Sequence, residues 1–520
     1  MKELLVEGNS DQQQGLISAV EKFALMQDMR QLSPVERRYR ELIPKTTPGP
    51  GQQYAFEVNL DQCTGCKACV VACHHENGLE EDETWRSVGL LYGGSSQYPV
   101  MQHITSACHH CLDPACMNGC PVNAYEKDKQ TGIVKHLEDQ CIGCQYCTFT
   151  CAYDVPKYSK KKGIVHKCDM CISRLNVGEA PACVRACPSE AIRITLVDTA
   201  VVRENPADYV RIPEAPDSRY TLPTTKYLRK KAFPENTTSI DFYSISPEHS
   251  HTPLIVMLVL TQFSVGIFCA GLFSGNHQHI FIALGVGLLA LAASVFHLGR
   301  PLYAFRAVLG LKRSWLSREI VAFGGFALLS TAYAVDYGIN STVNDIFAMT
   351  TAILGIFGVF CSAMVYKVTK RPFWDNHVTT LKFFLTTGIL GTSGILLVTM
   401  ITGAGQTAPV LCGIIMILTL IKLMVEATIL RHSLGHELTS LKKTAILMMG
   451  RFRPVTSWRF VCGILGGIVL PIFFWAGVIN GFLLPLFIFF LLLTGEFFER
   501  YLFFRTVIPL KSQEQKFSNV

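Results

Sequence analysis

The sequence predicts a cysteine-rich α+β domain followed by an all-α bundle of eight transmembrane helices. The first observation behind this prediction is a concentration of cysteine, because sixteen of the twenty lie between Cys63 and Cys187. The second is a change of composition near residue 250, beyond which long apolar segments alternate with short polar loops. The protein is therefore expected to fold partly in water and partly in a lipid bilayer.

The clustered cysteines form four groups of four. The groups are Cys63/Cys66/Cys69/Cys73, Cys108/Cys111/Cys116/Cys120, Cys141/Cys144/Cys147/Cys151 and Cys168/Cys171/Cys183/Cys187. Three thiolates on one short loop and a fourth one helical turn later are typical of bacterial ferredoxins, in which the fourth cysteine ligates the other cluster of a pair. In the ferredoxin pattern a proline follows the last cysteine, and here Pro121 follows Cys120 and Pro188 follows Cys187. The pattern predicts a ferredoxin-like α+β domain with four [4Fe-4S] clusters.

Two other uses of cysteine compete with clusters. A structural zinc ion usually takes two well-separated C-x2-C pairs, and a disulfide framework suits small secreted domains. Three cysteines within residues 63–69 crowd a tetrahedral ion but fit three corners of a cubane. Because all sixteen positions are cysteine, the sequence favours four-iron clusters throughout.

The spacing leaves two ways of sharing the ligands. Twenty residues separate the second and third groups, which suits one two-cluster ferredoxin. In that nested scheme the second group receives Cys151 in exchange for Cys120, and the first group receives Cys187 in exchange for Cys73. In the competing scheme the groups pair sequentially, the first with the second.

Four regions are expected along the sequence. They are a helical extension and linker (1–53), the four-cluster domain (54–200), an extended strap (201–250) and the membrane anchor (251–510). Short β-prone runs at 54–58 and 191–196 flank the cysteine groups, as in a ferredoxin half. The strap is assigned from its proline- and charge-rich composition without clear periodicity.

The anchor is predicted from apolar segments of roughly 20 residues, the length that crosses a bilayer as a helix. The segments lie at about 252–273, 278–298, 317–336, 345–366, 379–401, 407–430, 457–479 and 481–507. A buried core in a soluble protein would not sustain so many runs of this length. The sequence therefore predicts a multi-pass protein of the cytoplasmic membrane, in contact with lipid.

Basic residues predict the orientation of these helices. They occur in alternate loops, at Arg300, Arg306, Lys312, Arg313, Lys367, Lys370, Arg371, Arg431, Lys442, Lys443, Arg451 and Arg453. The loops between them carry no Lys or Arg, so the basic loops are expected to face the cytoplasm. With eight helices the cysteine-rich domain lies on that side too. The first 50 residues show no apolar run typical of a secretory signal.

Two sets of motifs resemble a known family. The cysteine groups, with Cys-His-His-Cys-Leu-Asp-Pro-Ala-Cys at 108–116, resemble the four-cluster iron–sulfur subunit of the DMSO reductase family of molybdenum enzymes over residues 54–230. The nested ligand scheme is also what this resemblance implies. Phe-His-Leu-Gly-Arg-Pro at 296–301 and Ser-Trp-Leu-Ser-Arg-Glu-Ile at 314–320 resemble the eight-helix anchor subunit of the same enzymes. The sequence is similar to a fusion of these two subunits.

The anchor resemblance implies a quinone site at His297, Arg300 and Glu319. The residues themselves suit this role, because quinone chemistry needs a hydrogen-bond donor at a carbonyl and groups that exchange protons. Intramembrane ionisable groups are functional candidates by default. The alternative is that His297 and Glu319 are interfacial residues whose polar ends reach the lipid headgroups.

Other polar membrane residues are expected to be structural. Lys422 and Glu426 lie four residues apart in one helix and are predicted to neutralise each other. Glu496, Glu499 and Arg500 are predicted to be interfacial. The remaining histidines lie at helix ends or in loops, so no haem is expected.

The sequence predicts a series of electron-transfer clusters and a quinone site, but no catalytic site for a further substrate. No G-x-G-x-x-G follows a strand, and no region is long enough for a molybdopterin domain. We expect an electron-transfer and anchor component that connects a separate molybdopterin catalytic subunit to the quinone pool, with no nucleic-acid partner. Quinone-reducing sulfite dehydrogenase and quinol-oxidising DMSO- or polysulfide-type reductase compete. A hydrogenase or formate dehydrogenase partner and a redox-driven ion-translocating module are the alternatives.

Overall fold

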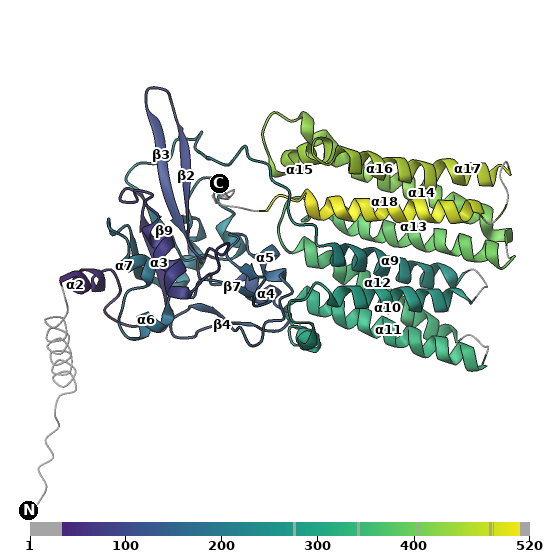
Figure 1. The fold of residues 1–520 in the computed structure, drawn as a ribbon, viewed down its shortest axis with the longest axis horizontal. Coiled ribbons are helices and arrows are strands. Elements are labelled where there is room, and N and C mark those ends of the chain that lie inside the picture. Colours follow the sequence, from purple (N-terminus) through teal and green to yellow (C-terminus); the bar gives the residue numbers. More distant parts are fainter. Residues whose placement is uncertain are drawn as a thin grey trace, which may run out of the picture.

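A computed structural model describes residues 34–273, 277–340, 344–403, 405–477, 481 and 483–509. It shows a cysteine-rich domain of short strands and helices at one end of a bundle of long helices (Figure 1). Most of the N-terminal extension lies outside the described residues, and its described part contains helix α2 (Pro34–Arg40).

Two three-stranded sheets and two hairpins frame the cysteine-rich domain. The strands are β1 (Gln52–Asn59), β2 (Ser87–Gly94), β3 (Pro99–Ser106), β4 (Tyr125–Lys127), β5 (Val134–His136), β6 (Lys157–Ser159), β7 (Ile164–His166), β8 (Ile192–Asp198), β9 (Lys226–Leu228) and β10 (Thr238–Ser239). The two β-prone runs of the sequence form β1 and β8, which pair antiparallel with Phe56 opposite Ile194. Both side chains are buried in the domain core, so this pair closes the domain around the cysteines.

Short helices follow the cysteine loops. They are α3 (Ala68–Asn77), α4 (Ala115–Gly119), α5 (Tyr146–Thr150), α6 (Ile172–Asn176), α7 (Ala182–Arg185) and α8 (Thr199–Glu204). The segment 201–250, predicted to be an extended strap, also holds one-turn helices at Pro206–Asp208 and Ser218–Tyr220. It contributes β9 to the first sheet and β10 to the second. This segment therefore belongs to the packing of the cluster domain.

The membrane part is built mainly of long helices aligned side by side, with two shorter helices, α15 and α17 (Figure 1). The helices are α9 (Thr252–Gly271), α10 (His279–Val295), α11 (Trp315–Asn340), α12 (Asp345–Lys367), α13 (His377–Ile401), α14 (Ala408–Ala427), α15 (Ser440–Met449), α16 (Arg453–Ile464), α17 (Leu470–Trp475) and α18 (Leu483–Arg505). Helical turns at Thr428–Leu434 extend α14, and a π-helical segment, Leu465–Val469, joins α16 to α17.

Six helices in the described part of the protein are long and apolar enough to cross a membrane. They correspond to six of the eight predicted segments. The other two predicted segments form α10, which has 17 residues, and α18, which contains Glu496, Glu499 and Arg500. A crossing by α10 and α18 stays a prediction.

Glycine allows the two most buried spans, α9 and α13, to cross at close range. A Cβ atom on Gly266 would lie 2.1 Å from the carbonyl oxygen of Thr387, and one on Gly391 would lie 2.3 Å from the oxygen of Gly266. Close backbone approach through small residues is how membrane helices gain van der Waals contact where lipid is as apolar as the side chains. The two helices therefore form the centre of the bundle.

Candidate functional site

Two cavities in the cysteine-rich domain are each walled by four cysteines. One is lined by Cys108, Cys111, Cys116 and Cys151. The other is lined by Cys63, Cys66, Cys69 and Cys187. Each cavity combines three cysteines of one group with the last cysteine of another. This is the nested arrangement and not the sequential one.

The other eight cysteines gather in two further sets. Burial raises the pKa of Cys73 to about 12, with further raising effects from Cys183 and Cys171. Burial likewise raises the pKa of Cys120 to about 11, with a further raising effect from Cys141. Mutual effects on pKa require thiols that lie close together. By the same exchange of the last cysteine, the remaining sets would be Cys73/Cys168/Cys171/Cys183 and Cys120/Cys141/Cys144/Cys147, and members of each set are among the thiols that raise one another's pKa.

Backbone N–H groups point at cysteine sulfur in a repeated pattern. The N–H groups of Gly143 and Met170 donate to the sulfur two residues earlier, at Cys141 and Cys168, over 3.4 Å each. In the two Cys-Pro turns the N–H groups of Ala124 and Ala191 donate to the sulfur four residues earlier, at Cys120 and Cys187, over 3.3 Å each. Thiolate sulfur ligating iron accepts such bonds, which help set cluster potentials. The cysteine sets therefore fit [4Fe-4S] clusters, and the two halves of the domain repeat one ligand geometry.

Two buried basic residues lie among the cysteines. Arg86 and Lys167 are 2% and 3% exposed. Burial alone would lower the pKa of Lys167, but the thiolates of Cys108, Cys116 and Cys168 raise it above its usual value. The thiolates of Cys183 and Cys69 do the same for the pKa of Arg86. Neither residue was predicted from the sequence, because the cysteine spacing does not indicate which basic residues lie near the clusters.

The Cys120/Cys141/Cys144/Cys147 set lies against the membrane helices. The N–H of Arg300 donates to the oxygen of Ile142 over 3.1 Å, and the N–H of Gly310 to that of Pro121 over 2.7 Å. The hydroxyl of Ser314 donates to the oxygen of Gly119 over 2.6 Å. The loops that carry these cysteines are thus bound directly to the segment between α10 and α11.

Glycines make this docking possible. A Cβ atom on Gly299 would lie 2.0 Å from the oxygen of Gly163, and one on Gly143 would lie 2.9 Å from the Cα of Gly299. Three backbone segments from two domains therefore meet where no side chain fits. Both the cysteine loop and the His-Leu-Gly-Arg motif depend on this contact.

We expect Gly299→Ala to loosen the contact between the two domains. The added methyl group overlaps backbone atoms that have no rotamer to change, and such overpacking costs about 1–3 kcal/mol. The thermal unfolding temperature of the purified protein should fall. Gly285→Ala is the matched control, because a Cβ atom there meets nothing within 4 Å. An equal effect of the two substitutions would contradict this account of the interface.

His297 and Glu319 both lie near this docking surface. His297 follows α10 and stands two residues before Gly299, and its Nδ1 is buried without a hydrogen-bond partner. Glu319, on α11, is 4% exposed, and its Oε1 also has no partner. Among the contacts of the described residues, none joins the two side chains. Each presents a buried polar atom that a further group can satisfy.

Tyr146 connects Glu319 to the cysteine set nearest the membrane. Its hydroxyl donates to the oxygen of Val365 over 2.7 Å. Burial raises the pKa of Tyr146 well above its usual value, and the negative charges of Glu319 and Cys144 are among the groups that raise it further. Glu319 and Cys144 are therefore both in the neighbourhood of Tyr146.

Two further residues, His251 and Arg300, belong to the region around His297. The pKa of His251 is lowered to about 4, chiefly by burial, with smaller contributions from neighbouring charges that include His297. Arg300 donates through Nη1 to the oxygen of Glu138 over 2.8 Å, so its side chain contributes to domain docking. A contact of Arg300 with quinone stays a prediction.

A network of charged side chains is buried in the other half of the bundle. Glu496, Glu499 and Arg500, predicted to be interfacial, are 0%, 4% and 0% exposed, so that prediction was wrong. Their partners come from other helices. Lys382 donates to Glu499 over 2.9 Å, and Lys422 forms an ion pair with Glu496.

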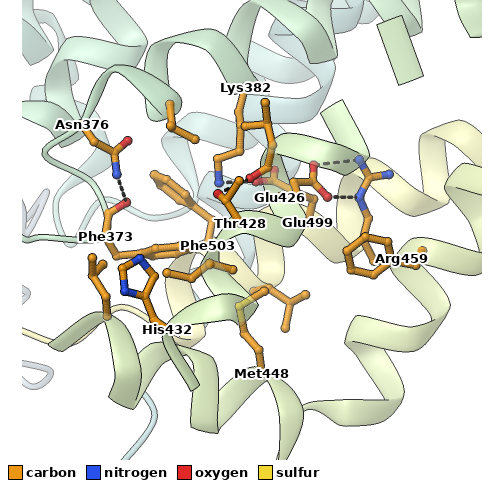
Figure 2. Close-up of a pocket in the computed structure, with 16 residues that line it drawn as sticks. Phe373, Asn376, Lys382, Glu426, Thr428, His432, Met448, Arg459, Glu499 and Phe503 are labelled. Atoms are coloured by element: carbon orange, nitrogen blue, oxygen red, sulfur yellow. Dashed lines mark hydrogen bonds and ion pairs between the residues drawn. The ribbon is translucent and has the colours of Figure 1, made fainter. Parts of the chain in front are cut away.

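Lys422 and Glu426 do form a pair, at 3.8 Å, but both are members of this larger network. Arg459 binds Glu426 through two hydrogen bonds of 2.8 and 2.9 Å. Figure 2 shows this pair and Lys382 at one side of a cavity that His432 and Met448 also line. Sequence reasoning considered only contacts within one helix and therefore missed contacts between helices.

Comparison with known proteins identifies both halves of the sequence. Residues 99–196 match the 4Fe-4S dicluster domain family, and residues 248–505 match the DMSO reductase anchor subunit (DmsC) family. The protein is 34% identical to the B subunit of the anaerobic dimethyl sulfoxide reductase of Escherichia coli (strain K12), over 33% of its own length and 86% of that subunit. It is 37% identical to the B subunit of the Haemophilus influenzae enzyme, over 28% of its own length and 76% of that subunit.

Two other relatives are matched over smaller shares of their own length. The hydrogenase-2 operon protein HybA of Escherichia coli O157:H7 is 35% identical over 25% of this protein and 48% of its own length. The iron–sulfur subunit of the nitrate-inducible formate dehydrogenase of Escherichia coli (strain K12) is 33% identical over 28% and 57%. Since the match covers most of a DMSO reductase B subunit and an anchor match follows it, the protein belongs to the DMSO reductase family, as an iron–sulfur subunit fused to its membrane anchor.

Proposed function

We propose that this protein carries electrons between a molybdopterin-containing catalytic subunit and the membrane quinone pool through four [4Fe-4S] clusters. The family membership makes it an iron–sulfur electron-transfer and anchor component of a DMSO reductase-type complex. The observation that carries the finer proposal is the contact between one cysteine set and the His297–Glu319 region. Through that contact the Cys120/Cys141/Cys144/Cys147 set lies next to the membrane helices.

Sixteen cysteines would hold the four clusters as nested sets. Cys63, Cys66 and Cys69 act with Cys187, and the remaining sets follow the same exchange. Each cluster, when bound, accepts and releases one electron at a time. The protein's own contribution is to fix the four sets, donate N–H groups to sulfur and bury most of the cysteines away from water.

His297 and Glu319 are proposed to bind the quinone head and exchange its protons. Oxidation of a quinol releases two electrons and two protons, and reduction of a quinone takes up the same number. The unpartnered Nδ1 of His297 and Oε1 of Glu319 are suited to hydrogen-bond the two oxygens or to receive these protons. Cys120, Cys141, Cys144 and Cys147 would hold the cluster that exchanges electrons with the quinone, because their loops are bound to the segment between α10 and α11.

The basic ends of the helices support a common orientation. Arg300, Arg306 and Arg371 all donate to backbone oxygens of the cluster domain. The basic loops and the clusters therefore share one side of the bundle, which the distribution of Lys and Arg predicts to be cytoplasmic. With eight crossings, including α10 and α18, protons and electrons of the quinone would be exchanged on that same side.

Among the possible reactions, quinol oxidation for a sulfoxide-type reductase is favoured. Both halves of the sequence match proteins named for DMSO reductase. A quinone-reducing sulfite dehydrogenase is the second candidate, favoured by the predicted cytoplasmic orientation. A hydrogenase or formate dehydrogenase partner is less favoured, because the anchor half matches a family named for DMSO reductase and those two relatives are matched over only 48% and 57% of their own length.

Two measurements on the anaerobically purified protein test the proposal. The purified protein should contain about sixteen iron and sixteen sulfide ions per polypeptide, as expected for four four-iron clusters. Addition of a reduced quinone analogue should reduce at least one cluster, followed by electron paramagnetic resonance. About half that iron, stoichiometric zinc, or clusters that respond to dithionite but never to quinol would contradict the proposal.

A further inference from the structure

The cysteine-rich domain buries two basic side chains without giving them carboxylate partners. Within residues 34–250, Arg86 and Lys167 are the buried Lys and Arg side chains. Neither forms an ion pair with an Asp or Glu among the described residues. An unpaired buried charge is costly, so an opposite charge of another kind must balance each of them. The nearest anionic groups are cysteine thiolates.

Lys167 lies between two cysteine sets. Its ammonium group is 3.7 Å from the sulfur of Cys108. It also donates to the backbone oxygen of Cys168 over 2.8 Å and to that of Val134. Cys108 and Cys168 belong to different sets, so the ammonium group lies beside ligand residues of both, at the sulfur of one and the backbone oxygen of the other.

Arg86 occupies the corresponding place between the two outer sets. Its Nη1 donates to the hydroxyl of Thr105 over 3.1 Å, and that hydroxyl lies 3.5 Å from the sulfur of Cys69. The ring of Phe56 covers one face of the guanidinium, with 4.6 Å between the guanidinium carbon and the ring centre. Nε and Nη2 are buried without hydrogen-bond partners. The thiolates that most strongly stabilise its charge are those of Cys183 and Cys69, which come from two sets.

The third gap between neighbouring sets is different. Tyr125 lies there, in one buried cluster with Cys116 of one set and with Cys120, Cys141 and Cys147 of the other. Its side chain is neutral, and its hydroxyl is buried. Two gaps thus contain a fixed cation, and the gap nearest the membrane contains a neutral phenol.

We propose that Arg86 and Lys167 raise the reduction potentials of the clusters on either side of them. The inference rests on the proposed four clusters. Reduction adds one negative charge to a cluster, and a fixed cation in a medium of low dielectric constant stabilises the reduced form more than the oxidised form. The Cys73/Cys168/Cys171/Cys183 cluster lies beside both cations and is affected twice. The Cys120/Cys141/Cys144/Cys147 cluster lies beside neither.

Redox titration of the intact protein, followed by electron paramagnetic resonance, tests this proposal. Lys167→Gln removes the charge but keeps N–H donors, and it should shift the midpoint potentials of the two flanking clusters to more negative values. Arg86→Gln should do the same for the two outer clusters. Lys167→Arg and Arg86→Lys keep the charge and should restore most of each shift. Loss of one signal in a Cys→Ser variant of each set assigns the signals.

Lys135→Met is the control, because Lys135 lies in the same domain, is only half-buried and pairs with a carboxylate, that of Asp128, and not with a cysteine. It should leave all four potentials unchanged. Unchanged potentials in both Gln variants at full iron content would overturn the proposal, and so would an equal shift of the membrane-nearest cluster. Failure of both variants to assemble clusters would also overturn it, because a residue that only tunes a potential is dispensable for assembly. Iron content far below four clusters in the unsubstituted protein would instead count against the proposed function.

Discussion

Glu319→Gln should abolish quinone-linked turnover of the complex while leaving its cluster content intact. Gln has nearly the same shape as Glu, so packing around this buried position is kept. The amide cannot take up a proton, and the carboxylate that exchanges protons with the quinone head is lost. The rate with quinol should fall at least about a hundredfold, as expected when a proton-transfer group is removed, whereas dye-linked activity of the catalytic partner should be unchanged.

His297→Ala should produce the same separation of the two activities. The substitution removes the donor whose Nδ1 is buried without a partner. Asp336→Asn is the control for Glu319, because Asp336 lies on the same helix and bonds Asn340 at an exposed position. If both site variants keep the normal quinol rate, the quinone binds elsewhere and the roles given to these two residues are wrong.

The cysteine positions were predictable because their geometry is local. Three ligands on one loop must be close in sequence, so the spacing itself predicts a cluster. The choice between nested and sequential exchange was not local, because Cys187 and Cys63 are brought together only when β8 pairs with β1. Spacing left that choice open, and the cavity walls distinguish the two schemes.

The segment after residue 200 shows a second limit of sequence patterns. β9 and β10 have three and two residues, too few for an alternating pattern to be visible. Their position is decided by pairing with β1 and β2. A proline-rich composition predicted an extended segment, and it did not predict that the segment adds strands to two sheets.

The charged residues of α18 show a third limit. Three charges near a helix end are usually interfacial, and the pattern within one helix offers nothing against this interpretation. Their neighbours are Lys382 on α13, Lys422 on α14 and Arg459 on α16. Contacts between helices that are far apart in sequence decide the environment of these charges.

Glu496→Gln should strongly destabilise the membrane half of the protein. Glu496 accepts hydrogen bonds from Thr386, Lys422 and Arg459 at a position with no exposed surface. Removing one partner of a buried ion pair costs about 3–5 kcal/mol, because the opposite charge remains in the protein interior. The unfolding temperature in detergent should fall clearly, whereas Glu437→Gln, at an exposed loop position, should leave it unchanged.

A second substitution distinguishes charge balance from loss of shape. The network contains four basic groups, on Lys382, Lys422, Arg459 and Arg500, and three carboxylates, on Glu426, Glu496 and Glu499. Glu496→Gln increases the excess of positive charge, and adding Lys422→Met returns it to the original value. The double variant should therefore unfold at a higher temperature than Glu496→Gln alone. If the two losses simply add, charge balance is not what holds these helices together, and the network is to be understood through its individual hydrogen bonds.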